Sequence, residues 1–164
     1  MTDGSDSFHI RFSTKTETLD IWTYDYQSFF GKLLLSVKAH NINPDKFYSE
    51  VISVDTSTAK KIYNLFQEYS ILEIPTQDSI KGWLMVLDGD LYTIEYSMPR
   101  IYRLKTYWTP SELDNTKEAK AITNLIAHLY KIIPSVNKSG FVCSLPPGQY
   151  EMGNYLTRCT KMHK

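Results

Sequence analysis

The amino-acid sequence predicts an α+β protein: an antiparallel sheet of about six to eight strands with two amphipathic helices packed on one face. Short segments that alternate apolar and polar residues follow one another at the start of the chain. Two segments, residues 55–74 and 115–133, carry apolar residues three and four positions apart and predict helices. Strands and helices are grouped rather than strictly alternating, which is typical of α+β folds.

The first half of the chain predicts a run of strands. Residues 1–6 are polar and are expected to be disordered, and residues 7–164 are expected to form a single domain. Four strand-like segments follow, of which the first two are expected to pair as a hairpin: Phe8–Phe12, Leu19–Tyr24, Gly31–Lys38 and Phe47–Val54.

Both predicted helices have start and stop signals. Asp55, Thr56 and Ser57 offer N-caps for the first helix, which should end before Pro75. Asn115 with Glu118 three residues later resembles a capping box for the second. That helix should end at Pro134, because proline cannot continue it.

The segment from Gly82 to Trp108 predicts a three-stranded meander. Asp88-Gly89 between two strand-like runs indicates a hairpin with a type I′ turn, which requires positive φ at both residues. Such a turn places Leu87 opposite Asp90, Met85 opposite Tyr92 and Trp83 opposite Ile94. Tyr102 and Leu104 are then expected on the buried face, and Glu95, Arg103 and Lys105 on the solvated one.

The C-terminal segment, residues 136–164, predicts an irregular tail. Gly140–Leu145 and Tyr155–Cys159 could form short strands around the Pro146-Pro147-Gly148 turn. Cys143 and Cys159 could form a disulfide or remain two free thiols, and the sequence leaves both open. No histidine lies at ligand spacing from them, so no zinc site is expected.

Charge and hydropathy restrict the partners and the compartment. Eighteen basic and eighteen acidic residues cancel, which argues against nucleic acid as a partner. The longest apolar run is Trp83–Leu87, too short for membrane insertion. The chain as it stands is therefore expected in the cytoplasm, or in the periplasm if Met1 replaces a removed signal peptide.

No catalytic or cofactor-binding motif stands out. The glycines are scattered, no Gly-x-Ser-x-Gly elbow is present, and the four histidines lie far apart. No cofactor is expected. A dispersed acid/base site could combine Asp88, Glu95 and His128. The alternative is that Asp88 only forms a turn and that His128 is an exposed residue on a helix surface.

An aromatic segment is the candidate partner-binding region. The chain has twelve tyrosines, and Trp22, Tyr24, Tyr26, Phe29 and Phe30 gather around a predicted loop. Tyrosine, tryptophan and phenylalanine are enriched in protein interfaces. The alternative is that Phe29 and Phe30 close the end of the sheet by burying themselves.

The central block also carries a resemblance. Asp88-Gly89-x-x-Tyr92-x-Ile94-Glu95, followed by Tyr102 and Tyr107-Trp108-x-Pro110, resembles a pattern of small uncharacterised bacterial, Bacteroidetes-like proteins. The resemblance covers about residues 80–133. It implies a bacterial origin and transfers no active site.

Three functions remain open at the level of sequence. The leading hypothesis is a non-enzymatic protein-binding module, most concretely an immunity-type protein that binds and neutralises a toxin or effector. The second is a small-molecule or peptide-binding domain that uses a cleft between the sheet and the second helix. The third is an enzyme with the dispersed site. The sequence does not indicate the oligomeric state.

Overall fold

The computed structural model describes residues 6–40, 46–84, 87–110, 116–153 and 155–160, and it has the predicted α+β architecture. One sheet holds eight strands, and every pairing in it is antiparallel. The strands are β1 (Phe8–Ser13), β2 (Glu17–Thr23), β3 (Phe29–Ala39), β4 (Phe47–Val54), β5 (Leu91–Met98), β6 (Ile101–Trp108), β7 (Gly148–Met152) and β8 (Tyr155–Cys159). The helices are α1 (Thr56–Glu68), α2 (Lys117–Ile132), α3 (Lys138–Ser144) and a short 3-10 turn, η1 (Gln77–Ser79).

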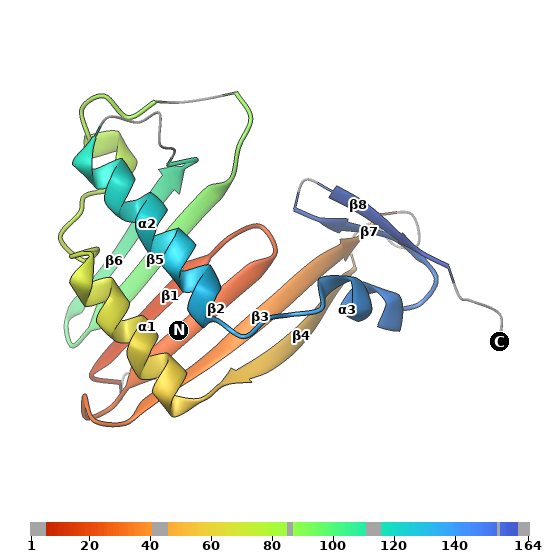
Figure 1. Cartoon of the computed structure of the whole chain (residues 1–164), viewed down its shortest axis with the longest axis horizontal. Helices are drawn as coiled ribbons and strands as arrows, with labels where there is room; N and C mark the ends of the chain where they lie inside the picture. The colour runs from red at the N-terminus through yellow and green to blue at the C-terminus, as the bar shows by residue number, and fades with distance from the viewer. Residues whose placement is uncertain (1–5, 41–45, 85–86, 111–115, 154, 161–164) are drawn as a thin grey trace.

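The sheet branches at its longest strand, β3. The strand order is β6-β5-β1-β2-β3-β7-β8, and β4 pairs with the other edge of β3. The pairing of β2 with β3 reaches only as far as Leu35, because β2 begins there. Beyond it, β7 pairs with the same edge of β3 at Lys38 and Ala39. Figure 1 shows the result: α1 and α2 lie across the sheet at one end, and α3 with the β7–β8 hairpin stands at the other. The four strands predicted in the first half of the chain are confirmed, as is the β1–β2 hairpin.

Helices α1 and α2 cover one face of the sheet, as the apolar spacing predicted. The carboxylate of Asp55 accepts a hydrogen bond from the N–H of Thr58 at 3.0 Å, which caps α1. The hydroxyl of Thr116 caps α2 by accepting from the N–H of Ala119 at 3.1 Å, whereas Asn115 lies outside the described residues. The main core between these helices and the sheet includes Ile10, Ile21, Leu33, Ile62, Phe66, Ile94, Ile122 and Leu125.

A second, smaller core forms where the tail folds back on β3. Residues 138–144 form α3 rather than the predicted strand, because the side chain of Asn137 caps a helical turn by accepting from the N–H of Gly140 at 2.8 Å. Phe141 and Val142 of α3 pack with Val37 and Tyr150. The tail is therefore regular rather than irregular, and the predicted strand at Tyr155–Cys159 is confirmed.

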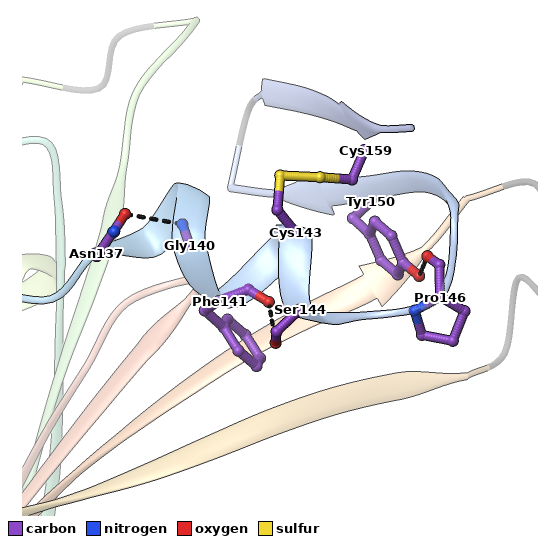
Figure 2. The surroundings of a disulfide bond; sticks show 8 residues. All are labelled: Asn137, Gly140, Phe141, Cys143, Ser144, Pro146, Tyr150 and Cys159. Carbon is purple, nitrogen blue, oxygen red and sulfur yellow. Dashed lines mark hydrogen bonds between the residues drawn. A yellow bond between two sulfur atoms is a disulfide. The ribbon is translucent and has the colours of Figure 1, made fainter. Parts of the chain in front are cut away.

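A disulfide closes this second core. Cys143 of α3 bonds to Cys159 of β8, with their Cα atoms 5.3 Å apart (Figure 2). Figure 2 also shows the hydroxyl of Tyr150 reaching the carbonyl oxygen of Pro146, which holds the turn before β7. Of the two alternatives for the cysteines, the structure thus has the bonded one.

The predicted hairpin at Asp88-Gly89 is wrong. Trp83 and Leu84 are not in a strand, neither Asp88 nor Gly89 has positive φ, and Met85 lies outside the described residues. Strand β5 pairs with β1 and β6 instead. Glycine is needed at position 89 for a different reason: a Cβ there would lie 1.7 Å from the hydroxyl oxygen of Thr109, which accepts from the N–H of Asp90.

The predicted faces of β6 are also reversed. The β5–β6 connection is only Pro99-Arg100, so Met98 pairs with Ile101 and Ile94 pairs with Lys105. Tyr102 and Leu104 therefore lie on the exposed face, and Lys105 points into the core with 7% of its surface exposed. A shift of one residue in register exchanges the two faces of a strand.

Lys105 is held by main-chain oxygens that follow α1. Its ammonium group donates to the carbonyl oxygens of Ile71 at 2.9 Å and Leu72 at 2.7 Å, and it lies 5.2 Å from the ring centre of Tyr96. Burial, and then the charge of Arg103, lower the pKa of Lys105 from 10.5 to about 8. The lysine thus fixes the loop after α1 to β6.

Across the described ranges, no helix has the length and apolarity that a membrane span requires.

The disulfide should stabilise the whole fold. A variant with Cys143→Ser and Cys159→Ser should lose about 3 kcal/mol of unfolding free energy. The reason is that the loop between these residues, which are 16 positions apart, is no longer closed in the unfolded chain. Urea unfolding of wild type with and without reductant measures the loss, and the variant should not respond to reductant. Equal stability of the oxidised and reduced wild type would contradict this expectation.

Lys105 should make stability depend on pH in the alkaline range. Its pKa is lower in the folded chain than in the unfolded one, so the unfolded chain binds more protons between about pH 8 and about pH 10. Relative to Lys105→Met, the unfolding free energy of wild type should rise by about 1.4 kcal/mol per pH unit there. Urea titrations of both proteins at stepped pH test this, and a constant difference would show that Lys105 titrates normally.

Candidate functional site

The face of the sheet opposite the helices is the candidate functional surface, and we call it the open face. Helices α1 and α2 pack on the main core and α3 on the second core, and both cores lie on one side of the sheet. No helix in the described ranges covers the other side. Large apolar side chains are exposed there, namely Phe30, Phe47, Val51, Tyr102 and Leu104.

Two rows of side chains cross the open face. In the aromatic row, the residues that stand opposite one another on β6, β5, β1, β2 and β3 are Tyr102, Ser97, His9, Trp22 and Phe30. In the neighbouring charged row they are Leu104, Glu95, Arg11, Asp20 and Lys32. The antiparallel register thus brings together residues that are far apart in sequence.

Asp20 is the centre of a cluster of ionisable groups. Its carboxylate accepts from the guanidinium of Arg11 through Nε at 2.7 Å and Nη2 at 3.1 Å. It is also bonded to Nε2 of His9 at 3.0 Å, and the ammonium group of Lys32 lies 3.7 Å away. Only 2% of Asp20 is exposed, which is unusual for a residue on an uncovered sheet face.

Hydrogen bonds determine the charge of Asp20. Burial would raise its pKa, but the hydrogen bonds from His9 and Arg11, together with the charge of Arg11, outweigh burial and lower the pKa to about 2. Asp20 is therefore an anion at neutral pH. Because several groups share it, the buried carboxylate holds the partly exposed side chains of His9 and Arg11 in place on the open face.

An aromatic cluster of Trp22, Tyr24 and Phe30 adjoins the Asp20 cluster. The rings of Trp22 and Phe30 are stacked with centres 5.9 Å apart, and Tyr24 lies 5.8 Å from Phe30. Tyr24 is 49% exposed and Phe30 is 40% exposed. Of the five predicted partner-binding residues, the structure gathers these three on the open face.

The other two predicted residues lie apart from this cluster. Phe29 is 1% exposed and packs on Tyr63 of α1 in the main core. Tyr26 also faces Tyr63, and its hydroxyl donates to the carbonyl oxygen of Ser7 at 3.0 Å. The two phenylalanines therefore differ: Phe29 is buried, as the alternative of closing the end of the sheet requires, and Phe30 is exposed on the open face, as a binding surface requires.

The loop that carries Tyr24 is held by its own polar side chains. The carboxylate of Asp25 accepts from the N–H groups of Gln27 and Ser28, each at 2.8 Å. The hydroxyl of Thr23 accepts from the N–H of Tyr26 at 2.9 Å. Such short-range bonds fix a turn, and this turn positions the main chain at Tyr24 beside Phe30.

A pocket of about 400 Å³ opens at the other end of the aromatic row. Its polar wall includes His9, Arg11 and Glu95, and the Pro99-Arg100 turn closes one side. The hydroxyl of Tyr102 donates to Glu95 at 2.6 Å, and this bond, together with burial, raises the pKa of Tyr102. The pocket thus combines groups of opposite charge with apolar walls.

The residues of the hypothetical dispersed acid/base site are not brought together. Glu95 lies on the open face, whereas His128 belongs to α2 on the other side of the sheet and is hydrogen-bonded through Nδ1 to Tyr69 at 2.7 Å. Asp88 lies in the exposed segment before β5.

The proposed cleft between the sheet and the second helix is filled. Ile122, Leu125 and Leu129 occupy it with at most 1% of their surface exposed. A pocket of about 370 Å³ lies instead beyond the last turns of α2, where Glu17 binds Tyr130 and Lys138.

The comparisons with known proteins identify no family. No protein-family model matches the chain, and no curated protein matches its sequence. The resemblance of residues 80–133 to small bacterial proteins therefore stays a prediction. Within the described residues, no group of three or more histidine, cysteine, aspartate or glutamate side chains could hold a metal ion.

The Asp20 cluster was missed by the sequence analysis. His9, Arg11 and Asp20 look like ordinary polar positions of two alternating strands. The available signal was the pairing itself: a β1–β2 hairpin with its turn at Thr14–Thr16 places Arg11 opposite Asp20. A cross-strand pair of opposite charges in the middle of a sheet is then expected.

Removing the charge of Asp20 should destabilise the fold, and the loss should depend on pH. Asp20→Asn leaves His9 and Arg11 without their shared anion, so the variant should lose about 2 kcal/mol at neutral pH. Because the folded pKa is about 2 and the ordinary value is 3.8, this advantage of wild type should shrink as the pH falls from 3.8 towards 2. Urea unfolding at stepped acidic pH measures it, with the exposed Asp78→Asn as control. A loss that is the same at every pH would contradict this assignment.

Proposed function

We propose that the protein is a binding module for another protein and that it binds through the open face. The observation that carries the proposal is the aromatic cluster of Trp22, Tyr24 and Phe30, in which Tyr24 is 49% exposed and Phe30 is 40% exposed, whereas the adjacent Phe29 is buried. Tryptophan, tyrosine and arginine dominate the residues that contribute most to interface affinity. Here they lie side by side, because Arg11 and His9 are next to Trp22 on the sheet.

The surface is suited to tight binding because it is preorganised. Stacked rings, a turn held by Asp25, and an ion cluster centred on Asp20 leave few torsions to be fixed on association. Rigid surfaces lose less entropy when they bind. The Asp20 cluster is already paired internally, so a partner that covers it need not supply a missing charge.

The most concrete form of this proposal is an immunity-type protein that neutralises a toxin or effector. Such a protein needs a stable small scaffold and a rigid complementary surface, and it needs no catalytic group of its own. The Cys143–Cys159 disulfide favours an oxidising compartment, and so the periplasmic alternative for the chain.

Binding and protection assays test the proposal. The protein should bind the product of the neighbouring gene and protect cells that express it. Tyr24→Ala and Phe30→Ala should each weaken binding by more than about ten-fold, as expected for residues at the centre of an interface. Phe47→Ala is the matched control, because Phe47 is an exposed aromatic residue on β4 of the same face. Unchanged affinity in both cluster variants would overturn the proposal.

A further inference from the structure

Strand β6 forms one edge of the sheet, and half of this edge is capped. Its main-chain groups alternate between pairing with β5 and pointing away from the sheet. Thr106 and Trp108 point away: their N–H groups donate to the hydroxyl of Thr76 at 3.2 Å and to the side-chain oxygen of Gln77. Their carbonyl oxygens accept from Thr76 at 3.3 Å and from the indole N–H of Trp83 at 3.2 Å.

The other half of the edge is open. By the same alternation, Tyr102 and Leu104 also point away from β5. No residue in the described ranges accepts from the N–H of either one. Among the described residues, the carbonyl oxygen of Tyr102 accepts only from the guanidinium of its neighbour Arg103, at 3.3 Å. A short row of main-chain donors and acceptors is therefore presented to solvent.

Among residues 101–104, which carry this row, only Arg103 is charged. Edge strands are usually shielded by charged residues, prolines or bulges, because they otherwise pair with other chains. Ile101, Tyr102 and Leu104 are instead apolar or aromatic and 41–54% exposed. The open half of β6 thus has both the hydrogen-bonding groups and the surface of a strand that lacks a neighbour.

The two faces of the open edge have different chemistry. Tyr102 and Leu104 lie on the open face, and Glu95 beside them is bound to the hydroxyl of Tyr102. Arg103 lies on the opposite face of β6, and its charge has no carboxylate partner among the described residues. A strand added here would place alternate side chains on the apolar side and on the cationic side.

We propose that residues 101–104 of β6 bind an extended segment of a partner protein as an added strand, and that this segment alternates apolar and acidic residues. Main-chain pairing would supply affinity and select an extended conformation. Apolar side chains of the segment would lie on Tyr102 and Leu104, and its carboxylates would face Arg103. The edge site is separate from the aromatic cluster, so either can exist without the other.

Nuclear magnetic resonance with a defined peptide tests the proposal. The probe is a capped peptide of alternating valine and glutamate, and the control has the same composition with the glutamates and valines in two blocks. The alternating peptide should slow solvent exchange of the amide protons of Tyr102 and Leu104 and leave those of Thr106 and Trp108 unchanged. The block peptide should bind more weakly.

Variants separate this site from the aromatic cluster. Leu104→Pro removes an N–H that points to solvent, which an edge strand tolerates, and it should weaken binding of the peptide about ten-fold. Leu104→Ala keeps the N–H and should keep the exchange protection, and Tyr24→Ala should have no effect on the peptide. The proposal would be overturned if the peptide did not bind, or if it bound without protecting the amides of Tyr102 and Leu104. It would also be overturned if these amides became protected at high protein concentration without peptide, because that would indicate pairing between two copies of the chain.

Discussion

The fold depends on β3, because this one strand carries both hydrophobic cores. Its inward residues Phe29 and Leu33 belong to the main core, and Leu35, Val37 and Ala39 belong to the second. Gly31 between them has no side chain because Ile21 and Val54 from the two flanking strands fill that space, where a Cβ would lie 2.6 Å from Ile21 and 3.1 Å from Val54. A register shift of one residue would remove both cores at once, so the pairing of β3 on both edges fixes which of its side chains face the helices.

A buried polar contact links the regions of the two hydrophobic cores that β3 carries. Glu17, at the start of β2, is 6% exposed and accepts from the hydroxyl of Tyr130 at 3.0 Å and from the ammonium group of Lys138 at 2.6 Å. Burial and the charge of Glu17 raise the pKa of Tyr130, so that phenol stays protonated. The contact joins the last turns of α2 to the first residue of α3. The cost of removing Glu17 from water offsets much of its attraction to Lys138, so we expect this contact to add little net stability.

The features that the sequence predicted correctly are those set by local periodicity. Alternation identified β1 to β4, and apolar spacing with Asp55 identified α1, because these signals depend only on neighbouring residues. The errors arise where a distant partner decides. Asp88-Gly89 is a turn signal only if the preceding run pairs with β5, yet β1 occupies that edge. The burial of Lys105 depends on carbonyl oxygens of the loop after α1, and the Asp20 cluster requires the register of neighbouring strands. Neither is visible in a single segment.

The aromatic row connects the two surfaces that we propose for binding. Tyr102 at the open edge and Phe30 in the aromatic cluster end the same row, with three strands between them. Four strand spacings separate their main chains by roughly 19 Å. A partner of ordinary interface size, about 800 Å² on each side, can cover this distance. A protein that pairs with β6 can therefore also reach the aromatic cluster across the pocket, where the buried charge of Asp20 keeps His9 and Arg11 in place.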